Sequence, residues 1–226
     1  MKRAIVFLVL LTAFTAVGSA QFFVEGSMSA GYNAGQSLFW DAFATPSNIF
    51  FKVSPLSGYQ LNDKIAVGAK ASIVRIKQKT ISLDPDTGGE VPLERRAPEW
   101  SFSVLGRYKL LGSKKFSFLV EGSAYISEKK TMDNSSSSSV YKSNESVSAK
   151  GVSLLPLVTY DLSEKWSIIA TGDFLRLDLS SKTERNMDTG FVAKRNHFGF
   201  TGQSILFRRV PEIRVGVIYH FNKSSR

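Results

Sequence analysis

Apolar and polar residues alternate along most of this chain. In the segment IRVGVIYHF, residues 213–221, almost every second residue is apolar and the intervening positions are mixed. Only a β-strand sorts neighbouring residues onto opposite faces in this way. The same pattern occurs in 22–32, 64–72, 100–110, 116–126 and 166–174, and less regularly in 49–59 and 151–160, each of which contains a proline. The alternation predicts eight strands and no amphipathic helix after residue 20.

A repeated sequence joins several of these strands. PLSGYQLNDK (55–64) and PLVTYDLSEK (156–165) share Pro, Leu, Tyr, Leu and Lys, and VLGRYKLLGSK (104–114) is a weaker third copy. Each copy leaves about five residues between strands, which is the length of a hairpin turn. The other connections, 33–47, 80–97, 128–148 and 180–210, are long. We expect the Tyr of each copy to lie at an interface, the Leu to fold beneath it and the Lys to reach water.

Short turns that alternate with long loops are typical of a transmembrane β-barrel, which also carries aromatic girdles where its apolar band meets water. The predicted girdle residues at the short-turn end are Tyr59, Tyr108, Tyr160, Trp166, Tyr219 and Phe221, and those at the long-loop end are Trp100 and Tyr32. The alternation alone does not show which strand face points into the barrel and which points outward. A soluble, lipocalin-like barrel that binds a small apolar ligand within it therefore stays open as an alternative.

The N-terminus indicates export. Residues 1–20 have a basic start, an apolar run from Ala4 to about Val17, and small residues before Gln21. This pattern predicts a cleaved signal peptide, because the apolar run is shorter than the roughly 20 residues that a membrane-spanning helix needs. The chain has no cysteine, so no disulfide holds it together. Its formal net charge is +10, which in an exported protein favours anionic lipid head groups over nucleic acid as a partner.

The turns GYQLNDK and TYDLSEK and the closing VGVIYHF resemble the eight-stranded outer-membrane β-barrel family, the small barrels of the OmpA and OmpX type. The resemblance covers residues 21–221 and implies an all-β, antiparallel, up-and-down transmembrane barrel, with 222–226 as a short polar periplasmic tail. In that family a terminal aromatic residue is read by the barrel-assembly machinery, and Tyr219 and Phe221 match it.

The strand faces opposite the apolar ones carry charged residues. If the apolar faces touch lipid, the lumen contains Glu25, Lys52, Lys70, Arg107, Glu121, Asp173 and Arg214. Acids and bases in nearly equal number are what an enclosed polar network requires. Because side chains fill an eight-stranded barrel, we expect a structural salt-bridge core and no wide channel. A narrow ion path is the alternative.

Pro55 and Pro156 each lie four residues before a girdle Tyr, within predicted strands. Proline cannot donate a ladder hydrogen bond. We therefore expect a bulge, or an early end of strand pairing, at both positions.

Catalytic chemistry has little support in the sequence. His197, expected in the last long loop, and His220 are the only histidines, so neither a His/Cys metal site nor a cofactor is predicted. An outer-membrane lipid-modifying enzyme would need a Ser/His pair with an acid at the outer rim, where His197 could meet Ser204, but nothing in NHFGFTGQS resembles a nucleophile motif. We expect no enzyme activity, and this enzyme class stays an alternative.

The long loops hold the expected function. Phe39, Trp40 and Phe43 are apolar residues that either dip into the outer interface or form a contact patch. The last loop is basic, with Lys194, Arg195, Arg208 and Arg209, and we expect 199–207 to form an extra strand that continues the last hairpin above the membrane. Its charge either meets the phosphates of lipid and lipopolysaccharide or is simply solvated. The sequence therefore predicts a structural or surface-interaction protein, with the external partner unidentified.

Overall fold

The structure is a computed structural model, and it describes residues 21–34, 47–83, 90–133, 144–172, 176–200 and 213–221. These residues form ten strands: β1 (Gln21–Ala34), β2 (Ser47–Gln60), β3 (Ile65–Leu83), β4 (Glu90–Gly112), β5 (Phe116–Asp133), β6 (Glu145–Asp161), β7 (Trp166–Gly172), β8 (Leu177–Asn186), β9 (Val192–Phe200) and β10 (Ile213–His220). Within these ranges there is no helix that is long and apolar enough to cross a bilayer.

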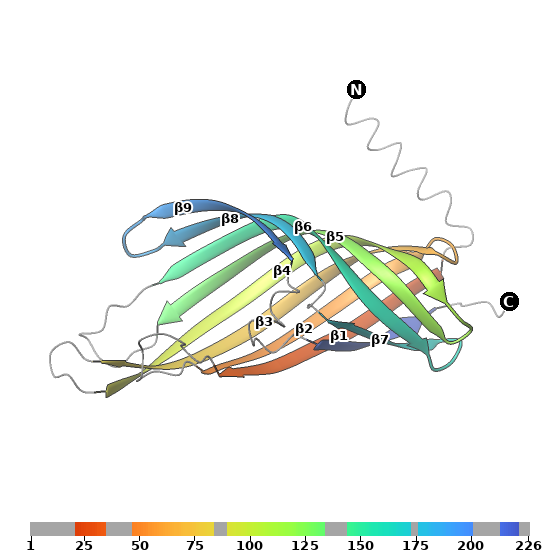
Figure 1. Ribbon diagram of the computed structural model, residues 1–226, viewed down its shortest axis with the longest axis horizontal. Helices are drawn as coiled ribbons and strands as arrows, with labels where there is room; N and C mark the ends of the chain where they lie inside the picture. Colours follow the sequence, from red (N-terminus) through yellow and green to blue (C-terminus); the bar gives the residue numbers. More distant parts are fainter. Residues whose placement is uncertain are drawn as a thin grey trace, which may run out of the picture.

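The strands close into an antiparallel barrel (Figure 1). The strands β1 to β7 pair in chain order, and β10 pairs with both β7 and β1. The ring therefore has eight members, and the predicted eight-stranded, up-and-down barrel is confirmed. The termini of the described barrel, in β1 and β10, lie at the end that carries the short turns.

The last hairpin of the barrel is interrupted. On β6, Leu157 pairs with Thr171 of β7 but Leu154 pairs with Leu177 of β8, so the partner of β6 changes between these two pairs. Above this break β8 pairs with the upper half of β6, and β9 pairs with β8. The β8–β9 hairpin projects beyond the ring at the long-loop end (Figure 1). The expected extension of the last hairpin is thus present, although its second strand is 192–200 and residues 201–207 lie outside the described residues.

The apolar faces point outward. In β4, Val104 is 55 % exposed, whereas the next residue, Leu105, is 6 % exposed and faces the lumen. Large apolar side chains such as Ile73, at 61 % exposure, cover the outer wall, while serines, acids and bases are buried inside. A soluble barrel would bury the apolar set and expose the polar one. The soluble, lipocalin-like alternative is therefore wrong.

The three short turns share one side-chain cap. The Asn62 carboxamide accepts hydrogen bonds from the amides of Lys64 and Ile65. The Ser163 hydroxyl accepts from those of Lys165 and Trp166, and Ser113 repeats the contact with Phe116. Short polar side chains close turns by bonding backbone amides two or three residues on. Each cap lies three residues before the strand that follows the turn, so the three turns close in the same way although the capping residue differs.

One detail of the expected turn is wrong. The leucines of the repeat do not fold beneath the tyrosines, because Leu61 and Leu162 are 37 % and 56 % exposed at the barrel rim. Lys64 and Lys165 are exposed as expected. The leucines line the mouth of the lumen on the short-turn side.

Both prolines interrupt pairing on one edge only. Pro55 pairs with Gly26 of β1, but the β2–β3 ladder passes from Val53 to Leu56 without a bridge and without a shift of register. Pro156 pairs with Val120 of β5, and on its other edge it borders the break between β7 and β8. At Pro55 the described β2–β3 ladder resumes at Leu56, so the expected bulge or early end of pairing is absent there, whereas at Pro156 pairing does end, at the break between β7 and β8.

The strands continue into segments that the sequence predicted as loops. The β3–β4 ladder runs as far as the pair Leu83–Glu90, and β5 reaches Asp133. Thr80–Ala97 and Glu128–Ser148 are therefore largely strand where they are described. In the β3–β4 ladder the extension lies beyond Trp100, and the extended strands project at the long-loop end of the barrel (Figure 1).

Candidate functional site

Four charged side chains meet inside the barrel. Arg107 on β4 is 4 % exposed and lies between two carboxylates. Its Nη1 atom lies 2.6 Å from Oε2 of Glu25 on β1, an ion pair by distance that is not aligned as a hydrogen bond. Its Nε and Nη2 atoms donate to Oε2 of Glu121 on β5 at 3.0 and 2.9 Å. Lys70 on β3 donates to the other Glu121 oxygen at 2.5 Å. We call Glu25, Lys70, Arg107 and Glu121 the lumen cluster.

Strand register brings this cluster together. Arg107 and Glu121 are partners across the β4–β5 ladder, so their side chains point to the same face. Glu25 comes from β1, which is separated from β4 by β2 and β3, so its contact with Arg107 crosses the lumen. Two acids and two bases cancel, as buried charges require. The cluster links four strands through the interior of the barrel.

The other residues predicted for the lumen have mixed outcomes. Lys52 faces inward and is half-buried, and Arg214 faces inward at 7 % exposure. The Arg214 Nη2 atom has no hydrogen-bond partner among the described residues. Asp173 lies outside the described residues. The alternation along each strand thus correctly predicted which described residues face the lumen. Only the pairing of the strands in three dimensions shows which of these side chains meet.

A second polar group occupies the lumen on the long-loop side of the cluster. The Tyr125 hydroxyl lies 2.9 and 3.0 Å from the two carboxylate oxygens of Asp178, and Arg176 donates to Asp178 at 2.8 Å. The Arg176 guanidinium also lies 5.5 Å from the centre of the Tyr125 ring. Sequence reasoning missed this group because Arg176 and Asp178 follow the interruption after β7, where the alternation of 166–174 ends. The one indication in the sequence was that Tyr125 falls at a position of the alternating pattern that faces the lumen.

Apolar side chains fill the lumen on the short-turn side of the cluster. Phe23, Leu157 and Ile169 are each 2 % exposed and belong to one buried group with Leu56, Leu105 and Ile218. At the short-turn end the lumen opens into a cavity of about 800 Å³, which is lined by charged residues of both signs such as Lys109 and Asp161 and reaches past Phe23 to Arg107. Stacked apolar and charged layers occupy the barrel interior, as expected for eight strands.

A serine, a histidine and an aspartate meet at this short-turn mouth. The Ser167 hydroxyl donates to Oδ1 of Asp161 at 2.6 Å and lies 3.2 Å from Nε2 of His220. A nucleophilic triad needs the acid on the histidine and a free serine proton directed at the imidazole. Here the acid takes the serine proton, so the arrangement is a structural hydrogen-bond chain.

The other histidine is not in a loop, as the sequence suggested, but in strand β9. His197 is exposed there and pairs with Ser180 of β8. Its proposed partner Ser204 lies outside the described residues. Within the described ranges, no group of three or more His, Asp or Glu side chains is placed to hold a metal ion.

Aromatic rings form a continuous belt where the first and last strands meet. Tyr59, Phe22, Phe221, Tyr219 and Trp166 follow one another across β2, β1, the end of β10 and β7, with centroids of successive rings 4.7 to 5.3 Å apart. Tyr108 and Tyr160 are exposed on the outer wall at the same end, and Trp100 lies toward the opposite end of the barrel. Tyr32 lies in β1, and its side chain is outside the described residues.

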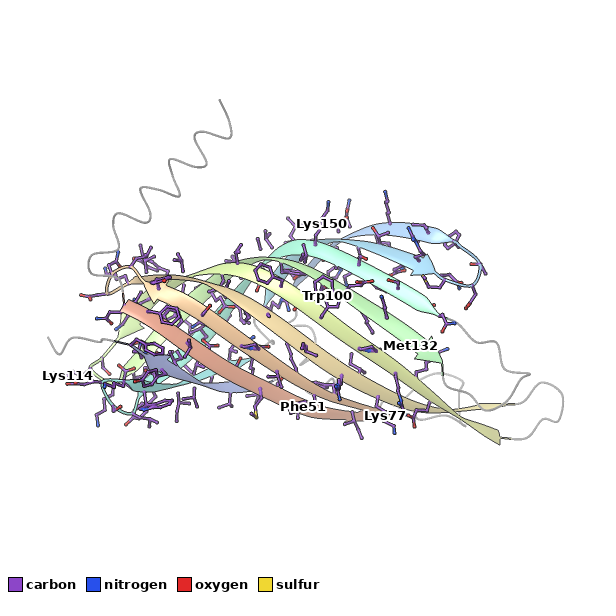
Figure 2. The ribbon with its side chains drawn as sticks, turned by 180° about the vertical axis from the view of Figure 1, so that it is seen from behind. Phe51, Lys77, Trp100, Lys114, Met132 and Lys150 are labelled. Carbon is purple, nitrogen blue, oxygen red and sulfur yellow. The ribbon has the colours of Figure 1, made fainter. Side chains whose placement is uncertain are left out.

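Basic side chains face outward above the Trp100 level. We call them the outer basic belt: Arg75, Lys77, Arg96, Lys130, Lys150, Arg185 and Lys194. At the described outward strand positions there, Glu94 and Glu128 are the only acids. Figure 2 shows Lys77 and Lys150 projecting from the outer wall, far from Lys114 at the short-turn end.

Part of this charge is neutralised within the protein. Hydrogen bonds from Lys77 and then Arg96 hold the pKa of Glu94 below its ordinary value. Glu128 lies 3.6 Å from Lys130 and accepts a hydrogen bond from the Trp100 indole. Arg75, Lys150, Arg185 and Lys194 form no ion pair among the described residues.

The remaining predicted loop contacts have separate positions. Arg195 is exposed on β9 beside Glu184, at 3.8 Å. Phe39, Trp40, Phe43, Arg208 and Arg209 lie outside the described residues.

Comparisons with solved structures return outer-membrane proteins. A major outer membrane protein from Thermus thermophilus shares 14% identity over 90% of this chain and 100% of that chain, with a TM-score of 0.47. Neisserial surface protein A (NspA) shares 14% identity over 90% and 99%, with a TM-score of 0.45. Ail, the attachment invasion locus protein of Yersinia pestis, shares 12% identity over 89% and 97%, with a TM-score of 0.36. No protein-family profile and no curated protein matches the sequence.

The assignment of the fold rests on the barrel itself. Every strand of the eight-membered antiparallel ring pairs with a neighbour on both sides, and the outer wall is apolar between the aromatic belt at the short-turn end and the level of Trp100. A wall of this kind is stable only against lipid. The chain therefore has the architecture of the small outer-membrane β-barrels, the OmpA and OmpX type, and spans the outer membrane with it.

Proposed function

We propose that the protein is a structural, surface-interacting barrel whose outer basic belt binds the phosphates of outer-leaflet lipid and lipopolysaccharide. The observation that carries this proposal is the excess of outward bases above the Trp100 level, several of which lack an ion-pair partner among the described residues. Lysine and arginine near an anionic membrane surface each contribute about 1 kcal/mol to binding. A belt of such residues would fix the height of the barrel in the outer leaflet and order lipid around it.

A role as a general porin or an enzyme has less support. Paired charges and packed apolar side chains occupy the lumen. The described histidines are placed in a hydrogen-bond chain and on an exposed strand, not beside an activated nucleophile. We further propose that the barrel-assembly machinery reads the terminal aromatic residues Tyr219 and Phe221 during insertion.

Lipid A binding by the detergent-solubilised barrel tests the proposal. The belt variant replaces Arg75, Lys130 and Arg185 by Gln. The matched control replaces Lys64, Lys114 and Lys165 at the short turns, which removes the same charge from the opposite end. We expect the belt variant to bind lipid A at least about tenfold more weakly and with a weaker salt dependence, while the control binds like the parent. Equal loss in both variants, or no loss in either, would overturn the proposal.

A further inference from the structure

A groove of about 680 Å³ lies in the lipid-facing wall over β4, β5, β6 and β8. Gly106, Gly122 and Ala124 form its floor, and its walls include Val152, Leu154 and Phe198. The register explains its shape. Gly106 pairs with Gly122 and Gly122 with Leu154, and one row above, Val104, Ala124, Val152 and Leu179 pair in the same order. Small side chains side by side thus leave a hollow between larger ones.

The fold does not require these two glycines. A Cβ added at Gly106 would approach only the Ala66 carbonyl, at 4.0 Å, and one at Gly122 only a flexible Leu154 methyl, at 3.3 Å. By contrast, a Cβ at Gly58 or Gly216 would meet backbone oxygen within 2.7 Å. Gly190 is the one described glycine with positive φ. Glycine inside a strand lowers stability and often marks the close approach of a ligand.

Positive charge lies at the upper end of this groove. Lys150 is exposed two residues above Val152 on the same face of β6, and it pairs with Ser181, which pairs with Asn196 of β9. Lys194 follows two residues above Asn196. Neither lysine forms an ion pair within the described part of the chain. The apolar hollow suits the acyl chain of an acidic lipid, and the two ammonium groups above it suit the charged head group.

We propose that the groove holds one acyl chain of a phosphorylated outer-leaflet lipid, and that Lys150, supported by Lys194, binds its phosphate. The inference rests on the proposed function and deepens it, because it names one lipid site within the belt. The positive charge beside the groove favours this lipid over a second barrel or an apolar helix as the occupant. The groove is continuous with a basic surface, which complements a phosphate and would repel a second copy of the same face.

The test counts lipid A molecules that stay on the detergent-purified barrel, by native mass spectrometry. The groove variant carries Gly106→Val and Gly122→Val, and the head-group variant carries Lys150→Gln. Gly26→Val is the matched control, because Gly26 also faces lipid in mid-barrel and its Cβ would have nothing within 4 Å. Heat modifiability on detergent gels verifies that each variant is folded. A diacylglycerol with the same acyl chains tests the need for phosphate.

We expect one lipid A per parent barrel and per Gly26→Val barrel. Filling the groove should reduce retention at least about tenfold, the effect of displacing about two methylene groups. Lys150→Gln should reduce it about fivefold, and diacylglycerol should not be retained. Full retention by the groove variant, equal loss in Gly26→Val, or equal retention of diacylglycerol would overturn the inference. Lys150 is absent from the belt variant above, so failure of the groove and failure of the belt are distinguishable.

Discussion

Arg107 and Glu25 belong to strands that are not neighbours in the barrel wall, yet their side chains lie 2.6 Å apart. The contact spans the interior, and Glu121 occupies the other side of the same guanidinium. A barrel wall with this cross-link resists changes of its cross-section, because any widening separates buried opposite charges.

Breaking this link should be costly. Arg107→Met removes the ion pair with Glu25 and leaves Glu121 with the Lys70 contact, and loss of one partner of a buried ion pair costs about 3–5 kcal/mol. We expect the free energy of unfolding, measured by urea titration in detergent micelles, to fall by about that amount. Lys114→Gln, at an exposed turn, serves as the control and should change it by less than about 0.5 kcal/mol. An unchanged Arg107→Met barrel would show that the lumen cluster does not stabilise the fold.

The aromatic belt at the closing seam gives a second prediction. Tyr219 contacts both Trp166 and Phe221, with ring centroids 4.7 Å apart in each case. Each aromatic pair contributes about 0.5–1.5 kcal/mol beyond its buried area, so Tyr219→Leu should destabilise the barrel by about 1–3 kcal/mol. The Trp166 emission should also change, as measured by fluorescence. Tyr108→Leu, at the same end but without a ring partner among the described aromatic pairs, is the control and should have a smaller effect.

The turn caps are testable as a set. Asn62→Ala and Ser163→Ala each remove a side chain that accepts two backbone amides. At about 0.5–1.5 kcal/mol per hydrogen bond, and with water able to replace part of the loss, we expect each change to cost about 1 kcal/mol. Refolding from urea into micelles provides the measurement. Ser57→Ala, on the outer face of β2, should have little effect, and an equal loss there would contradict the role of the caps.

On the lipid-facing side of the barrel, the cost of introducing a charge should depend most strongly on depth in the membrane. Arginine on the lipid face of a barrel costs about 2–4 kcal/mol at the midplane and about 0–1 kcal/mol near the interfaces. Val104→Arg, in the middle of β4, should therefore destabilise the barrel in vesicles far more than Leu111→Arg, beyond the Tyr108 girdle position. Equal costs at both positions would contradict the predicted membrane boundary.

The alternation of apolar and polar residues was enough to predict most strands of the barrel wall. Alternation in segments such as 100–110 and 213–221 indicated the strands, and the turn repeat indicated which end is short. The change of partner from β7 to β8 was not predictable, because it depends on how both strands pair with β6 on either side of Pro156. The projecting β8–β9 hairpin follows from that change, and His197 was misplaced in a loop for the same reason.

The site was predictable only in part. Parity placed Arg107 and Glu121 in the lumen, but their contact depends on the β4–β5 register. The groove was invisible in the sequence because Gly106 and Gly122 become neighbours only across two strands. The space around Gly106 shows that a side chain would fit there.

The orientation of the strand faces is the central claim, and a chain without cysteine makes it directly measurable. Single-cysteine variants Val104→Cys and Ser103→Cys, spin-labelled in vesicles, report on adjacent positions of β4. We predict that the label at 104 is accessible to oxygen dissolved in lipid and shielded from a water-soluble nickel reagent, and that the label at 103, inside the barrel, is shielded from oxygen. If the label at 103 is the one exposed to lipid oxygen and that at 104 is not, the barrel is turned inside out and the account is wrong.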